Sequence, residues 1–172
     1  YHYAEEAWHG IYKQYRDDIL FAGSDQWSDD NRKLREEAGL SCLTYNKIKS
    51  KILWIVNNAR ANTPDAKIHP LQDSNKQTAD ILSGIIRSIN YRSNAKSARI
   101  NALQNTVTGG LGVWRILLTH DIDGDNDYDI SEKRILDPTS FLIDPDSVEE
   151  DFSDAEYCFV ISWVNRKLFE KQ

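Results

Sequence analysis

The feature that most constrains the fold is a change in hydrophobic spacing at the pair Gly109-Gly110. Before this pair, apolar residues recur at every third or fourth position, the spacing of helices that bury one face. After it come short runs rich in β-branched and aromatic residues, which favour strands: VWRILLTH, EKRILD, SFLID and AEYCFVISWV. The chain is therefore expected to have an α+β fold, with N-terminal amphipathic helices followed by a small, mostly antiparallel sheet.

Capping residues divide the helical part. The first helix is expected to bury Ala4, Trp8, Ile11, Tyr12, Tyr15 and Ile19 and to end at Gly23. Ser28 can cap a short charged helix that stops at Gly39, and a third helix ends before Pro64. The expected inner face of this third helix is Ile48, Ile52, Ile55, Val56 and Ala59. An extended edge segment at 66–71 and two helices, at 74–94 and 94–108, follow.

Composition narrows the class of protein. The 172 residues are 40% apolar and 28% charged, which is typical of a globular chain. The net charge of −6 argues against non-specific nucleic-acid binding by the chain as a whole. No run has the length and apolarity of a membrane span, and no signal peptide is visible. Cys42 and Cys158 are expected to be buried and reduced. The chain lacks Met and both ends fall in helical patterns, so a piece of a longer protein is expected.

An acidic run, DIDGDNDYDISE, lies between two of the expected strands. Its spacing matches a calcium-binding EF-hand loop, and the candidate metal ligands are Asp121, Asp123, Asp125, Asp127 and Glu132. However, the sixth position is Asn126 instead of Gly, and the flanking segments indicate strands where an EF-hand has helices. The run is therefore interpreted as a long acidic hairpin loop that binds calcium only adventitiously. A calcium-binding module using loop 121–132 is the alternative function.

No other constellation points to chemistry. His2, His9, His69 and His120 lack metal-ligand spacing, and TGGLGVW lacks the lysine-hydroxyl pair of a phosphate-binding loop. The chain is therefore expected not to be an enzyme and to require no cofactor. A basic row in the last two helical segments comprises Arg87, Arg92, Lys96 and Arg99. It is interpreted as a solvated face or as ion pairs at a subunit contact, with phosphate contacts as a third reading.

Seven segments, in order and with similar gaps, resemble the N-terminal part of phage portal proteins, the head-to-tail connectors of tailed phages. They are DDILFAGSDQW, LREEAGLSCLTYNKI, NNARANTPDAKIHP, ADILSGIIRSINYRSNA, TGGLGVWRI, ILDPTSFLIDPDS and SDAEYCFV, which together run from Asp17 to Val160. The pattern is most similar to the portal family of short-tailed phages.

The resemblance implies that 1–172 is a single domain, the wing-like N-terminal fragment of a longer portal subunit in a phage or prophage. Portal subunits form a dodecameric ring at the portal vertex of the virion and assemble in the host cytoplasm. The ring passes double-stranded DNA in and out without sequence-specific binding. Its implied partners are further copies of itself, capsid and scaffolding proteins, the terminase and tail adaptor proteins, and no membrane. The acidic run would be a hairpin loop between two wing strands.

Overall fold

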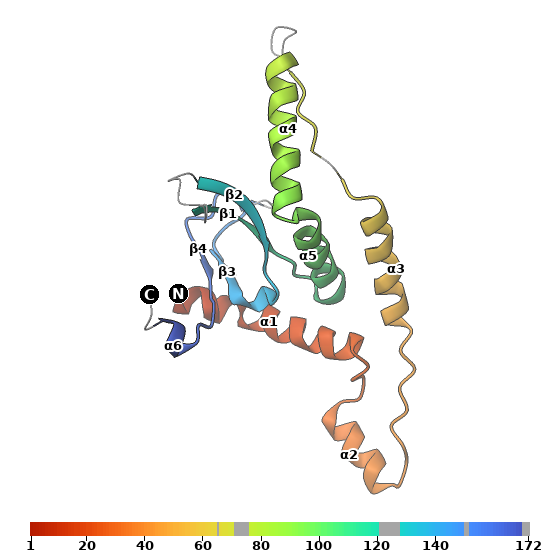
Figure 1. Ribbon diagram of the computed structural model, residues 1–172. Helices are drawn as coiled ribbons and strands as arrows, with labels where there is room; N and C mark the ends of the chain where they lie inside the picture. The colour runs from red at the N-terminus through yellow and green to blue at the C-terminus, as the bar shows by residue number, and fades with distance from the viewer. Residues whose placement is uncertain (65, 71–75, 121–127, 150–151, 170–172) are drawn as a thin grey trace.

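The computed structural model describes residues 1–64, 66–70, 76–120, 128–149 and 152–169. Within these residues, helices precede two small antiparallel sheets, which confirms the expected α+β order (Figure 1). The helices are α1 (His2–Ala22), α2 (Asp29–Glu37), α3 (Ile48–Ala61), α4 (Lys76–Arg92), α5 (Ala95–Gly109) and the short α6 (Arg166–Phe169). The strands are β1 (Trp114–His120), β2 (Tyr128–Arg134), β3 (Phe141–Ile143) and β4 (Cys158–Val160), with a 3-10 turn at Pro138–Ser140.

The elements are arranged in an open shape. In Figure 1, α1, α5 and the two sheets lie together, whereas α4 projects at one end and α2 at the other. Helix α3 lies to one side and is reached through segment 40–47, which has no regular secondary structure. None of the helices in the described ranges is long and apolar enough to cross a membrane.

Helix α5 lies at the centre of the packing and contacts α1, α3, α4, β1 and β2. Its buried residues are Ala95, Ala98, Ile100 and Ala102. Alanine side chains let neighbouring elements approach the helix axis closely, and the closest approach is at Gly112. A Cβ atom there would overlap the carbonyl oxygen of Ala102 and the hydroxyl of Thr106. Gly112 therefore allows the chain to enter β1 directly against α5.

A second cluster fixes α1 on the β3–β4 sheet. Ala4 and Tyr12 of α1 pack with Leu142 of β3, and Trp8, Tyr157 and Phe159 border them. The indole Nε1 of Trp8 donates a hydrogen bond to the Ile143 carbonyl oxygen at 3.0 Å. The Tyr12 hydroxyl donates to the Phe141 carbonyl oxygen. The two aromatic side chains thus add directional bonds to the apolar contact.

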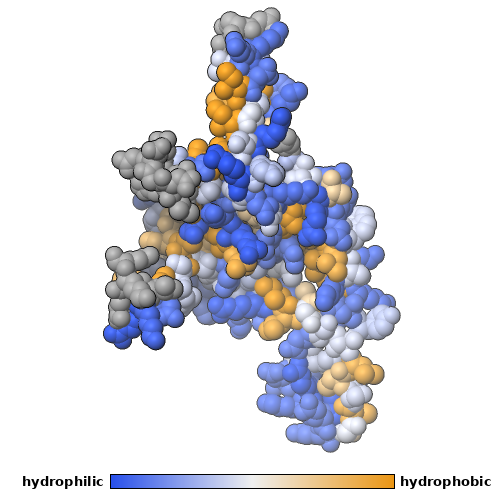
Figure 2. All heavy atoms as spheres, viewed as in Figure 1, coloured by the Kyte–Doolittle hydropathy of each residue, from blue (hydrophilic) through white to orange (hydrophobic). Residues whose placement is uncertain are grey.

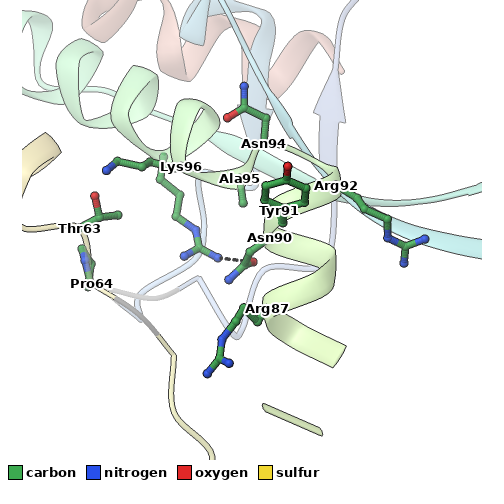
Figure 3. Close-up of a pocket in the computed structure, with 10 residues that line it drawn as sticks. Thr63, Pro64, Arg87, Asn90, Tyr91, Arg92, Asn94, Ala95 and Lys96 are labelled. Carbon is green, nitrogen blue, oxygen red and sulfur yellow. Dashed lines mark hydrogen bonds between the residues drawn. The ribbon is translucent and has the colours of Figure 1, made fainter. Parts of the chain in front are cut away.

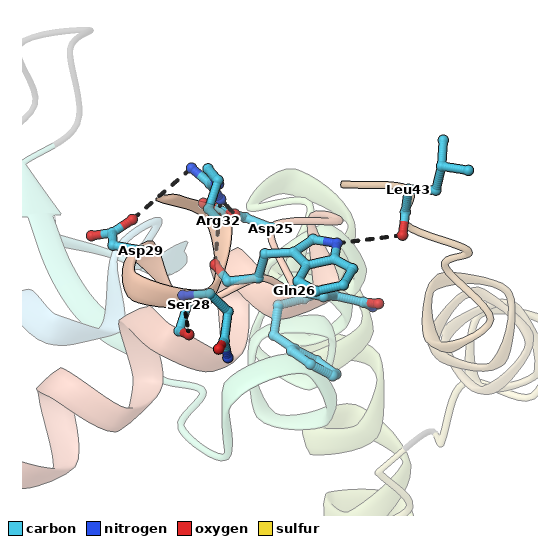
Figure 4. A network of polar contacts seen from close by, with 9 residues as sticks. Asp25, Gln26, Ser28, Asp29, Arg32 and Leu43 are labelled. Carbon is cyan, nitrogen blue, oxygen red and sulfur yellow. Dashed lines mark hydrogen bonds and ion pairs between the residues drawn. The ribbon is translucent and has the colours of Figure 1, made fainter. Parts of the chain in front are cut away.

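The projecting helix α2 is held by polar contacts with residues close to it in the sequence, as Figure 4 shows. Ser28 accepts a hydrogen bond from the Asn31 backbone N–H, which confirms the predicted cap. Arg32 pairs with Asp25 and donates to the Trp27 carbonyl oxygen at 3.4 Å. The Trp27 indole in turn donates to the Leu43 carbonyl oxygen at 3.3 Å. These bonds connect the segment that precedes α2 to the helix and to the segment that follows it.

Several sequence expectations about burial were wrong. The exposed side chains are Ile11 and Ile19 of α1 and Ile48 and Ile55 of α3, because few elements of the described chain cover these faces. Both cysteines are free, as expected, but Cys42 is only half-buried and Cys158 is exposed.

The sheet differs from the expectation in two ways. It consists of two separate two-stranded sheets, β1–β2 and β3–β4, instead of one. Strand β2 begins at Tyr128, so residues 128–132, which were expected to lie in the acidic loop, belong to a strand. Tyr128 and Ile130 favour strand, and Leu118 pairs with Ile130 in the ladder. Residues 121–127, the remainder of the predicted acidic loop, lie outside the described residues.

The close approach at Gly112 gives a first prediction. Replacing Gly112 with Ala should lower the free energy of unfolding by about 1–3 kcal/mol, because backbone atoms of α5 must shift. The matched control is Gly84→Ala in α4, where nothing lies near the added Cβ. The control should be more stable by about 0.5–1 kcal/mol, since Ala is the better helix former. Urea unfolding of both variants measures the contrast, and equal effects would contradict the packing.

Tyr12 makes stability depend on alkaline pH. Burial, and then the charges of Asp137 and Tyr1, raise the pKa of Tyr12 to about 12. An unfolded tyrosine titrates near pH 10, so between about pH 10 and 12 the unfolded chain loses a proton that the native chain keeps. The free energy of unfolding should therefore fall as pH rises through this window. Tyr12→Phe should flatten the fall, whereas Tyr45→Phe, at an exposed side chain, should not. Urea unfolding from pH 9 to 11.5 tests this.

Candidate functional site

Of the predicted metal ligands, Glu132 lies within the described residues and the four aspartates do not. Asp121, Asp123, Asp125 and Asp127 lie outside the described residues. Glu132 lies in β2, is only 6% exposed and pairs with Arg99 of α5. Arg99 uses two nitrogens, with Nε 3.0 Å from Oε2 and Nη2 on Oε1. A calcium ion that used Glu132 would have to displace this arginine. Within the described residues, no three His, Cys, Asp or Glu side chains lie close enough together to form a metal site. Calcium binding by the five predicted ligands stays a prediction.

The basic row predicted from the sequence converges on one cavity. A cavity of about 780 Å³ lies where α4 meets α5, beside the end of α3 (Figure 3). Its lining includes Pro64, Arg87, Tyr91, Arg92, Lys96 and Arg99. None of its lining residues is acidic. We call this cavity the cationic pocket.

The junction between the two helices explains the convergence. Asn94 has a φ of 51°, the left-handed conformation that Asn tolerates, and it separates α4 from α5. The last turn of α4 and the first turn of α5 therefore face the same hollow. No side chain caps the first turn of α5, so the positive end of the helix dipole adds to the positive potential there.

Two of the four cations are used within the chain. Arg92 pairs with Asp129 of β2 at 3.0 Å, and both side chains are partly exposed. Arg99 pairs with Glu132 and also donates to Oδ1 of Asn90 at 3.3 Å. These bonds connect α4 and α5 to β2. The sequence had suggested a subunit contact or a solvated face for this row, and these two pairs are instead intramolecular.

The other two cations remain available. Arg87 and Lys96 make no ion pair and no side-chain hydrogen bond with any residue that the structure describes. Tyr91 lies between them in the sequence and is 89% exposed. The pocket therefore offers two unpaired positive charges and an exposed aromatic ring, a combination suited to an anionic partner with some apolar surface.

Sequence reasoning missed a second charged surface, the connection between β3 and β4. Its acidic residues are Asp144, Asp146, Glu149, Glu150, Asp151, Asp154 and Glu156, and it contains no Lys or Arg. This absence of basic residues was the signal that could have identified it. We call its described part, 144–149 and 152–156, the acidic connection.

Hydrogen bonds fold the acidic connection onto itself. Asp154 accepts from the Ser147 hydroxyl and from the backbone N–H of Val148 at 2.7 Å. These bonds, with that from Ser147 the largest cause, hold the pKa of Asp154 below its usual value, so the carboxylate stays charged at neutral pH. Asp144 accepts from the N–H groups of Asp146 at 3.1 Å and Glu156 at 3.2 Å. The surface is therefore preorganised.

The chain exposes far more area than a compact protein of its size. Its accessible surface is 13747 Å², against about 8600 Å² expected for a compact 19.8 kDa monomer. Figure 2 shows apolar side chains along the projecting α4, where Ile81, Leu82 and Ile85 are exposed. Trp54 of α3 and Trp163 are also exposed. Surfaces of this kind mark contacts with other polypeptide segments.

Comparisons with known proteins agree on one family. A family model described as the phage P22-like portal protein matches residues 1–172. A portal protein of Acyrthosiphon pisum secondary endosymbiont phage 1 is 29% identical over 133 residues, covering 74% of this chain and 18% of that protein. A portal protein of Helicobacter pylori bacteriophage KHP30 is 24% identical over 119 residues, covering 69% and 19%. The chain thus spans less than a fifth of the length of these relatives.

The two ion pairs at the pocket should differ in their effect on stability. Arg99→Ala leaves Glu132 buried without its partner and should cost about 3 kcal/mol of unfolding free energy. Arg92→Ala breaks a more exposed pair and should cost less than about 1 kcal/mol. Urea unfolding of both variants measures the difference. Similar losses would contradict the assignment of the Arg99–Glu132 pair as the main connection between α5 and β2.

Proposed function

Because the chain belongs to the phage P22-like portal protein family, we propose that it forms part of a subunit of a portal ring. The ring is a structural assembly, and this part of it performs no catalysis. Twelve copies of the complete subunit surround a channel through which double-stranded DNA is packaged and ejected. The observation that carries the proposal is the family match over the whole of residues 1–172.

The surface of the chain supports assembly into a ring. A closed ring uses a heterologous interface, in which one surface of each subunit contacts a different surface of its neighbour. Such an interface requires large areas that a single chain leaves uncovered. The open shape, the exposed faces of α3 and α4, and the total accessible area fit this requirement.

The charge balance suits a DNA conduit. A net charge of −6 gives little of the phosphate-binding energy that would hold DNA in place. DNA therefore passes the ring without sequence-specific binding. We further propose capsid and scaffolding proteins, the terminase and tail adaptor proteins as partners of the assembled ring. The ring would form in the host cytoplasm and reside at the portal vertex of the virion. No cofactor is needed for these contacts.

Electron microscopy of the complete gene product that contains residues 1–172 tests the proposal. Purified protein should give end-on views of rings with a central hole and twelvefold symmetry, and EDTA should leave the rings intact. Compact monomers under assembly-permissive conditions would contradict the proposal. If the protein stayed monomeric and calcium, at a thousandfold excess over its Kd, raised the free energy of unfolding by about 4 kcal/mol, the calcium-binding alternative would replace the ring proposal.

A further inference from the structure

Two surfaces of this chain have opposite charge, and each keeps charged side chains that pair with no residue in the described ranges: Arg87 and Lys96 on one, Glu149 and Glu156 on the other. We propose that the cationic pocket of one subunit binds the acidic connection of a second copy. The inference rests on the proposed ring, whose heterologous interface places two different surfaces of identical chains against each other. It specifies which two surfaces meet.

The pocket gathers positive charges that would attract an anionic partner. Arg87 and Lys96 share one hollow with Arg92 and Arg99, and only the latter two are neutralised by described carboxylates. Arg87 and Lys96 are exposed, and gathered like charges raise the local positive potential, which attracts an anionic partner. Carboxylates brought to Arg87 and Lys96 would form charge-assisted hydrogen bonds with them.

The acidic connection supplies carboxylates in the required form. Glu149 and Glu156 are exposed, and their side chains make no ion pair or hydrogen bond with the residues that the structure describes. They stand on a backbone that Asp144 and Asp154 already fix by hydrogen bonds. Little conformational entropy would therefore be lost when the connection binds.

Apolar groups accompany the charges on both surfaces. Val148 is 87% exposed and Phe152 is also exposed, beside the free carboxylates of the acidic connection. The pocket presents the exposed Tyr91 ring and Pro64. Both surfaces thus combine apolar area with charge of opposite sign, which gives an interface both affinity and register.

A second copy fits better than nucleic acid as the occupant. The carboxylates of Asp144, Asp146 and Asp154 accept hydrogen bonds from the acidic connection itself and from the Tyr3 hydroxyl, not from the pocket. The cations, in contrast, form one hollow in a chain whose net charge is negative. Binding along a duplex needs an extended positive surface, whereas a folded acidic segment needs only a local site.

Charge exchange in the complete gene product tests the pairing. One variant carries Arg87→Glu and Lys96→Glu, a second carries Glu149→Lys and Glu156→Lys, and a third carries all four changes. The control carries Lys13→Glu and Lys33→Glu, which make the same charge change on exposed residues of α1 and α2. Circular dichroism verifies folding, and mass photometry measures the ring fraction against protein concentration at 50 and 300 mM salt.

The expected result is a loss of ring association of at least tenfold in each of the first two variants. The fourfold exchange should restore association to within about threefold of wild type, because the pair is re-formed with its signs reversed. The control should assemble like wild type. The two losses should shrink at the higher salt concentration, as exposed charge pairs are screened.

Other results would overturn the inference in distinguishable ways. If wild type forms no rings, the proposed function fails and the pairing fails with it. If wild type and the Arg87→Glu, Lys96→Glu variant assemble equally well, the ring stands and the pairing is wrong. Losses that the fourfold exchange does not restore would also exclude the pairing. If that variant assembles normally but loses binding of a 60-base-pair DNA duplex of arbitrary sequence, the pocket is a nucleic-acid site.

Discussion

Close packing around α5 is the constraint on which the rest of the structure depends. Its buried Ala98 and Ala102 let neighbouring elements approach, and Gly112 uses that space. At Gly109, the last residue of α5, an added Cβ would overlap the Tyr15 ring of α1. Both contacts forbid even one added methyl group without a shift of neighbouring atoms. Helix α5 thereby fixes α1 and β1 at once, and the ion pairs of β2 add to the same centre.

The elements outside this centre have apolar faces that the described chain leaves uncovered. Helices α3 and α4 present apolar side chains to solvent, Trp54 and Ile81 among them. The residues of such a helix lose conformational entropy on ordering, and only burial of their apolar faces offsets that loss. Part of this burial is missing within the residues that the structure describes. The open shape therefore fits the proposed ring, in which neighbouring polypeptide segments would cover these faces.

The sequence predicted local features well and distant pairings poorly. The change in period at Gly109-Gly110 predicted the switch from helices to strands, and Ser28 predicted a helix cap, because both depend on neighbouring residues. Glu132 is the opposite case. Spacing placed it in a calcium loop, but its described partner is Arg99, 33 residues earlier on another element. The exposed Ile55 shows a further limit, since an apolar face looks the same whether its cover lies in the chain or outside it.

The arrangement of charge connects the packing to assembly. Arg92 and Arg99 hold the ends of α4 and α5 against β2, and the same side chains line the cationic pocket. The pocket therefore depends on the same two ion pairs that hold β2 against the helices. In the proposed pairing, a partner that binds Arg87 of α4 and Lys96 of α5 would add a further connection between these two helices. The projecting α4, which the described chain contacts mainly near its C-terminal end, would gain most from that connection, because its own apolar face adds little packing within the described residues.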